Sequence, residues 1–281
     1  MKKAFYLPLL VLLVLFSQQV SARILVVDKS GLGQYTTIQA GINAALAGDT
    51  VKVDPGVYNE QLNISTNIVV EGSGYEYTQI VSNTDPAVSM SAGTIMWFGI
   101  SSNTGRGVTM SGGTLTNCVV WNCPKAGIEI SGGTTALVQN CDIINNNLNK
   151  SSGQIYADNG TSSTVINTII WTPPSGDYYD AVWNDSYCNV LYCRSDHQSN
   201  GGTGDINANP QFTSATDFTL SGGSPCIDAG KPDIYDPDGT RSDIGYYGGP
   251  NAPVFPVVTN LRIYLNPNGT VNVQATAQSR Y

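Results

Sequence analysis

The side chains best suited to chemistry gather in one stretch, WTPPSGDYYDAVWNDSYC, residues 171–188. Its aromatic rings could stack on sugar rings, and its carboxylates could bind sugar hydroxyls or a calcium ion. Asp180 and Asp185 could also hydrolyse a glycosidic bond, if one served as the acid and the other as base or nucleophile. The alternative is an aromatic loop that packs over the flank of a core. The candidate substrate-binding residues are Trp171, Tyr178, Tyr179, Trp183 and Tyr187.

Lyase chemistry would need a basic side chain to remove a sugar proton, together with a calcium ion that acidifies this proton. Lys125, Lys150 and Arg194 are the available bases, and each could equally be a solvated surface charge. Arg194 joins Asp180 and Asp185 as a candidate catalytic residue. The only histidine, His197, lies in a polar loop and excludes any mechanism that needs two.

A second acidic stretch, DIYDPDGTRSD at 233–243, contains a D-x-D-G core. Calcium loops use this spacing because alternate carboxylates converge while glycine allows the tight turn. The closing Glu of the EF-hand pattern is missing, so an Asp-Gly turn is the alternative. If calcium is a cofactor, the candidate ligands are Asp236, Asp238 and Asp243.

The first 22 residues predict a secretory signal: Lys2 and Lys3, an apolar run, and then Val20-Ser21-Ala22 as a cleavage site. Removing its two lysines takes the formal net charge from -8 to -10. A chain this acidic lacks the basic patch of a nucleic-acid-binding protein. It would also repel a polyanionic glycan unless a divalent cation bridged the two. We expect a secreted or cell-surface protein with no membrane span in the mature chain.

The six cysteines permit three disulfides in an exported protein, but their spacing favours none. The C-x4-C spacing occurs twice, and residues five apart in a strand point to opposite faces. The CxxC pairs of zinc sites are absent. We prefer buried thiols over a disulfide for Cys118 and Cys141. The others are Cys123, Cys188, Cys193 and Cys226.

An internal repeat organises the middle of the chain. VTMSGGTLTNC, from Val108, is followed by IEISGGTTALVQNC, and VSMSAGT precedes both, so that Met90, Met110 and Ile130 are spaced by twenty residues. Short strands separated by Gly, Asn, Ser and Thr fill residues 62–225. Repeats of this length predict a parallel β-helix of seven or eight turns, in which each turn buries its apolar face on the next. The alternative is an antiparallel β-sandwich.

Aligning the repeats places one corner of each turn in a column. Asparagine suits such a corner because it tolerates left-handed backbone geometry. Its amide could also bond to the asparagine above and below. The corner residues are Trp97, Asn117, Asn140, Asn167 and Tyr192, and the inward residues that follow them include Phe98, Cys118, Cys141 and Thr168.

The chain before the repeats predicts a lid. Residues 24–27 form an apolar strand, and Thr36 or Thr37 can cap a following helix. The apolar stripe of this helix consists of Ile38, Ile42, Ala45 and Leu46. Such a lid would hide the open edge of a stack of strands.

Both ends of this region resemble known proteins. VDKSGLGQYTTIQAGINAALAGDTVKVDPGVYNEQLNI is similar to the first turn of pectin methylesterases and related right-handed parallel β-helix proteins, through Gly31, Gly33, Tyr35, Thr37, Ile38, Gln39, Gly48, Asp49, Val51, Pro55, Gly56, Tyr58 and Glu60. Residues 206–249 resemble the terminal segment of many secreted bacterial β-helix proteins of unassigned activity. The resemblance implies an all-β, right-handed, single-stranded parallel β-helix with a short N-terminal capping helix.

The catalytic motifs of the characterised enzymes are absent from the sequence. It lacks the Gln-Asp-Thr and Gly-Arg-Pro-Trp motifs of pectin methylesterases, the Gly-His-Gly of polygalacturonases and the Arg-x-Pro of common pectate lyases. We therefore expect a β-helix that binds polysaccharide or acts as an extracellular scaffold, rather than an enzyme. The alternative is a polysaccharide lyase or glycoside hydrolase with its site on the 171–198 flank.

The expected organisation has three parts. Residues 1–22 are the signal peptide. Residues 23–249 are the β-helix, with an N-terminal cap and first turn at 23–61 and a C-terminal cap at 205–249. Residues 250–281 are a linker and a short β-hairpin or truncated module, because strands flank an Asn-Pro-Asn-Gly turn.

Overall fold

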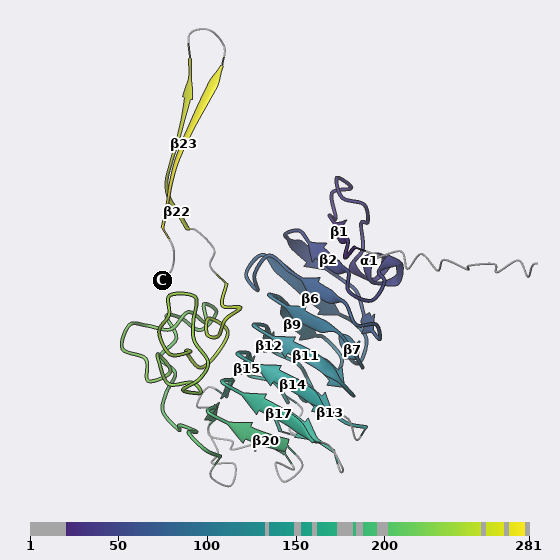
Figure 1. Ribbon diagram of the computed structural model, residues 1–281, viewed down its shortest axis with the longest axis vertical. Coiled ribbons are helices and arrows are strands. Elements are labelled where there is room, and N and C mark those ends of the chain that lie inside the picture. Colours follow the sequence, from purple (N-terminus) through teal and green to yellow (C-terminus); the bar gives the residue numbers. More distant parts are fainter. Residues whose placement is uncertain are drawn as a thin grey trace, which may run out of the picture.

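The fold is seen in a computed structural model, which describes residues 21–132, 135–148, 153–158, 162–172, 182–183, 188–195, 202–253, 257–266 and 270–278. The predicted signal peptide lies almost wholly outside the described residues. In Figure 1 the strands stack as the rungs of one coil, with α1 beside the first rungs. Within the described residues, no helix is long and apolar enough to cross a membrane.

Three parallel sheets, here named A, B and C, form the sides of the coil. Sheet A contains β1 (Ile24–Val27), β2 (Thr50–Val53), β5 (Val69–Glu71), β8 (Thr94–Met96), β11 (Gly113–Thr116), β14 (Ala136–Gln139), β17 (Ser163–Ile166) and β20 (Cys188–Leu191). Sheet B contains β3 (Gly56–Tyr58), β6 (Thr78–Ser82), β9 (Gly99–Ser102), β12 (Val119–Trp121), β15 (Asp142–Ile144), β18 (Ile169–Trp171) and β21 (Arg194–Ser195). Sheet C contains β4 (Leu62–Ile64), β7 (Val88–Met90), β10 (Val108–Met110), β13 (Ile128–Ile130), β16 (Ile155–Ala157) and β19 (Val182–Trp183).

This architecture confirms the parallel β-helix, with fewer complete turns than predicted. Within the described residues, sheets A, B and C have eight, seven and six strands, so six turns contain a strand of every sheet. At the first end, α1 follows β1 in place of two strands. At the far end, β20 and β21 are the last strands of the coil among the described residues, and Ile206 adds a single parallel bridge to Arg194.

The twenty-residue repeat predicted the register correctly. Met110 pairs with Met90 on one side and with Ile130 on the other. The side chains of Met110 and Ile130 are completely buried, and Met90 is 2% exposed. The predicted corner column is also confirmed, because its residues all have positive φ, between 44° and 65°: Trp97, Asn117, Asn140, Asn167 and Tyr192. Phe98, Cys118, Cys141 and Thr168 follow them into the fully buried interior.

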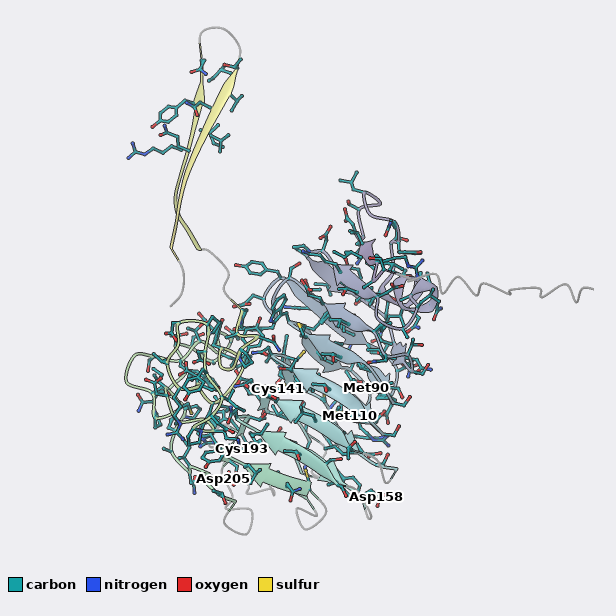
Figure 2. All side chains as sticks on the ribbon, in the orientation of Figure 1. Met90, Met110, Cys141, Asp158, Cys193 and Asp205 are labelled. Carbon is teal, nitrogen blue, oxygen red and sulfur yellow. The ribbon has the colours of Figure 1, made fainter. Side chains whose placement is uncertain are left out.

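All six cysteines lie in the part of the chain that the structure describes, and all are buried without forming a disulfide there (Figure 2 labels Cys141 and Cys193). The preference for buried thiols at Cys118 and Cys141 is therefore confirmed. Burial raises the pKa of the Cys118 thiol to about 12, so it is held in the neutral form.

The N-terminal helix α1 (Ile38–Ala44) begins where the sequence predicted. Thr37 is the N-cap, and its hydroxyl accepts an N–H bond from the first turn at 3.3 Å. The carboxylate of Glu60, from the next turn of the coil, accepts the N–H groups of Ile38 and Gln39 at 2.9 and 3.1 Å. A negative charge at a helix N-terminus is stabilising, so this part of the resemblance to pectin methylesterases has a structural role.

The predicted apolar stripe of the helix is wrong at one position. Ile38, Ile42 and Ala45 are buried, but Leu46 is 54% exposed. The helix ends at Ala44, so the chain turns away before Leu46 can join the stripe.

The segment 205–249, which the sequence predicts as a C-terminal cap, runs back along the side of the coil. The corner asparagines hold it: Asn117 Nδ2 donates to the Tyr246 and Gly248 carbonyls at 2.7 and 2.8 Å. Asn140 and Asn167 both donate to Ser242 Oγ at 3.1 Å. In Figure 1 the segment lies beside the coil, next to β12 and β15.

The prediction that these corner amides bond to one another is therefore wrong. The returning segment brings carbonyl groups closer to them than the neighbouring rungs do. An asparagine ladder forms instead at the next corner, where Asn145 Nδ2 donates to Asn122 Oδ1 at 2.7 Å.

The returning segment covers the outer face of sheet B. Val119, Asp142, Ile169 and Arg194 occupy successive positions of one outward column, and each is at most 2% exposed. Asp142 Oδ1 accepts the N–H of Tyr246 at 3.0 Å. Sheet B thus lies between the coil interior and the segment, as parallel sheets buried on both faces do.

Beyond the coil, β22 (Val257–Leu265) and β23 (Val271–Gln278) form an antiparallel hairpin. Figure 1 shows the hairpin projecting away from the coil. Ile263 pairs with Val273 across the hairpin, and their side chains are 64% and 58% exposed.

Candidate functional site

The outer face of sheet C carries a column of polar and aromatic residues parallel to the coil axis. These residues are in register from strand to strand, at the strand spacing of about 4.8 Å. From β4 to β16 they are Asn63, Ser89, Thr109, Glu129 and Tyr156. The apolar residues on either side of them in each strand point into the core, so strand alternation forces this column outward.

A charged cluster adjoins this column at Glu129. Arg106 Nε lies 3.0 Å from Glu129 Oε2, and Arg106 Nη1 lies 3.8 Å from Asp85 Oδ1. Lys125 Nζ lies 2.6 Å from Asp85 Oδ2. Two cations therefore balance two carboxylates. The four side chains are 25–41% exposed, so all of them can be reached from solvent.

Asp85 stays ionised in this cluster. Partial burial acts to raise its pKa, but the Arg106 N–H, the Lys125 ammonium and the Arg106 charge together lower its pKa. The Asp85 side chain packs directly against Gly105. A Cβ at residue 105 would lie 2.2 Å from Asp85 Cγ, so this position needs glycine. The column and the charged cluster together define the sheet C surface.

The structure places only part of the predicted aromatic stretch. Trp183 lies in β19, where it pairs with Tyr156 and extends the sheet C column by one register position. Tyr178, Tyr179, Tyr187, Asp180 and Asp185 lie outside the described residues, as do Lys150 and His197. Their roles stay predictions.

Trp171 and Arg194 lie on sheet B rather than with the sheet C surface. The Arg194 guanidinium carbon lies 3.8 Å from the centre of the Trp171 ring. Arg194 is 2% exposed and donates to the carbonyls of Ala208 and Ile170 at 2.5 and 3.2 Å. These bonds fasten the returning segment to the coil, which gives Arg194 a structural role, and its catalytic role stays a prediction.

The acidic stretch 233–243 borders a hollow of about 320 Å³ on the returning segment. Asp236 accepts the N–H groups of Asp243 and Gly249, at 3.0 and 2.5 Å. Asp238 accepts the N–H and hydroxyl of Thr240 at 2.9 and 2.8 Å. Burial raises the pKa of Asp236 to about 6 and that of Asp243 to about 7, and the neighbouring acids reinforce both shifts.

These carboxylates are engaged in holding turns. Across the described residues, no group of three or more His, Cys, Asp or Glu side chains is arranged to hold a metal ion. The arrangement seen here therefore does not fit a calcium site formed by Asp236, Asp238 and Asp243, and calcium binding stays a prediction.

Glu129, Arg106 and Tyr156 are residues that the sequence did not single out. A signal for Glu129 was present. The repeat aligns the central residue of VTM with that of IEI, which places Thr109 and Glu129 in one outward column. Nothing in the sequence indicates that Arg106, in the turn before β10, pairs with Glu129 in the next rung.

No family model and no curated protein matches this chain. Among solved structures, pectin methylesterase PemA from Erwinia chrysanthemi is similar over 90% of this chain and 85% of its own, with a TM-score of 0.48 and 13% sequence identity.

Proposed function

We propose that this protein is secreted or surface-attached and binds a polysaccharide along the sheet C surface. The observation that carries the proposal is the register of the outward column, which presents Thr109, Glu129 and Tyr156 on successive rungs. Such a straight, rigid row matches an extended polymer better than a compact ligand. The predicted signal peptide supports a location outside the cytoplasm.

The side chains of this surface suit a sugar chain. The ring of Tyr156 offers an apolar face to a pyranose, and its hydroxyl offers a hydrogen bond. Thr109 and Glu129 can exchange hydrogen bonds with sugar hydroxyls. Since charges balance within the cluster of Asp85, Arg106, Glu129 and Lys125, hydroxyl groups rather than net charge would dominate recognition.

Binding is favoured over hydrolysis at this surface. A glycosidase needs one carboxyl group that stays protonated to donate to the leaving oxygen. The lowered pKa of Asp85 opposes that role, and Arg106 links Asp85 with Glu129. An enzyme whose site involves Asp180 and Asp185 is the alternative.

The experiment measures retention of the full chain by immobilised neutral and acidic polysaccharides, together with the product masses in the supernatant. Tyr156→Ala and Glu129→Gln should each weaken retention about tenfold, a loss of roughly 1.4 kcal/mol. Tyr235→Ala is the matched control, because this tyrosine is 55% exposed on the returning segment.

If all three variants are retained as strongly as the parent chain, the binding surface lies elsewhere. Shortened or unsaturated products would establish the enzyme alternative. Loss of retention in Tyr235→Ala alone would move the site to the returning segment.

A further inference from the structure

A hollow of about 380 Å³ opens where the returning segment stops covering sheet B. Three aromatic residues from distant parts of the chain line it: Tyr75, Trp121 and Phe218. This volume falls in the usual range for small-molecule sites. The hollow lies on sheet B and shares no lining residue with the sheet C surface.

The aromatic wall is held rigidly. The Tyr75 ring centre lies 6.3 Å from that of Trp121, edge to face, and 5.8 Å from that of Phe218. Tyr75 Oη accepts the Phe218 N–H at 3.0 Å, which ties the returning segment to the coil at this point. A Cβ on residue 99 would lie 2.5 Å from the Trp121 indole, so Gly99 lets the indole lie against the preceding rung.

Polar side chains form the opposite part of the lining. Gln79 lies on β6, and among the described residues its side-chain amide has no hydrogen-bond partner. The Asn145 amide donates to Asn122 at 2.7 Å, which leaves the Asn145 oxygen and the Asn122 NH₂ group for a ligand. Glu76 is oriented by the Tyr247 hydroxyl, which donates to Glu76 Oε1 at 2.7 Å.

This combination specifies the chemistry of a ligand. A rigid aromatic wall needs an apolar ring face, and the amides need several hydroxyl groups, so a pyranose satisfies both. Glu76 is among the described residues that line the hollow, and no lysine or arginine is, so the lining is acidic and disfavours uronates and other anionic sugars. A fully apolar ligand would pack against the aromatic rings but would leave the amides unpaired, which disfavours it.

We propose that this hollow binds one neutral pyranose unit, as the end or side branch of a glycan. It is a second site, which differs from the sheet C surface in position and in the size of ligand it takes. Binding of a single neutral sugar unit here does not require that the sheet C surface bind a polymer.

The test titrates the full chain with methyl β-glucoside, methyl β-galactoside, methyl β-xyloside and galacturonate. Binding is followed by calorimetry and by tryptophan fluorescence. At least one neutral glycoside should bind, and galacturonate should bind at least tenfold more weakly. Gln79→Ala should weaken the neutral sugar about five- to tenfold, the loss expected for one hydrogen bond. Trp121→Phe should reduce the fluorescence response and weaken binding further.

Tyr156→Ala on sheet C is the control and should leave binding of the glycoside unchanged. Gln79→Ala changes a partly exposed side chain, so it tests the site even if Trp121→Phe perturbs the packing. The proposal is overturned if no neutral glycoside binds, if Gln79→Ala binds as the parent does, or if Tyr156→Ala is the variant that loses binding. It is also overturned if galacturonate binds as tightly as the neutral sugars.

Discussion

Replacing Asn140 by alanine should loosen the returning segment from the coil. Asn140 is completely buried at the corner between β14 and β15. Its Nδ2 group donates to Ser242 Oγ at 3.1 Å and to the Asp243 carbonyl at 3.0 Å. Its φ is 49°, a left-handed conformation that asparagine tolerates better than alanine.

The expected loss follows from these two features. Two buried hydrogen bonds contribute about 1 kcal/mol each, and the left-handed backbone costs alanine about 1 kcal/mol more than asparagine. Asn140→Ala should therefore lower the free energy of unfolding by about 3 kcal/mol. For a chain of this length the melting temperature should fall by roughly 6–12 °C.

Asn140→Gly separates the two contributions. Glycine adopts positive φ without strain, so this variant loses the amide bonds while keeping the backbone geometry. It should be destabilised by about 2.5 kcal/mol, because the greater entropy of glycine in the unfolded chain adds roughly 0.5 kcal/mol to the loss of the two bonds.

Urea unfolding followed by tryptophan fluorescence gives the free energies, and limited proteolysis reports release of the segment 228–249. Cleavage in this segment should become faster in both variants. The reasoning fails if Asn140→Gly is as stable as the parent, because the amide bonds would then contribute nothing. It also fails if glycine is worse than alanine, because the left-handed corner would then carry no cost.

Other expected outcomes concern titration, thiols, the buried cation and calcium. Because burial raises the pKa of Asp236 to about 6 and that of Asp243 to about 7, the folded protein keeps protons that the unfolded chain loses near pH 4. The free energy of unfolding should therefore fall by roughly 2–3 kcal/mol, after allowance for solvent screening, as the pH rises from 4 to 7. Asp243→Asn should flatten this dependence in urea unfolding, and an unchanged slope would contradict the assignment. The six thiols should not react with Ellman's reagent until the protein unfolds, and a reducing agent should leave the melting temperature unchanged; fast labelling of the native protein would contradict their burial. Arg194→Met should lower the free energy of unfolding by about 3 kcal/mol, because the carbonyls of Ala208 and Ile170 lose the guanidinium as donor. A change in sugar turnover with no change in stability would instead favour a catalytic role for Arg194. If calcium binds at Asp238 and its neighbours, millimolar calcium should raise the melting temperature at pH 8 and Asp238→Asn should remove the increase; equal melting curves with calcium and with a chelator would end that prediction.

The twenty-residue repeat determined most of the fold by itself. Identical positions in successive turns must stack when strands pair in parallel, so Met90, Met110 and Ile130 pair as their spacing predicts. The left-handed corners at Asn117, Asn140 and Asn167 follow from asparagine chemistry, which is local. The capping of α1 by Thr37 is local as well. These features need no knowledge of contacts between distant segments.

The path of the returning segment was decided by the tertiary structure. Asn140 and Ser242 are 102 residues apart, and nothing in either sequence neighbourhood names the other. Doublets such as Val119-Val120 and Ile143-Ile144 are typical of strands buried on both faces, but such a pattern does not indicate what covers the outer face.

The candidate sites also have one part that the sequence predicts and another part that only the tertiary structure decides. The sequence placed Thr109 and Glu129 in one column, because alternation along a strand sets which side chains point outward. The charged cluster and the hollow at Trp121 each combine residues from different rungs or from the returning segment. Residues from different turns come within reach of one another only when the rungs stack about 4.8 Å apart. The sequence of a single turn therefore does not predict these groupings.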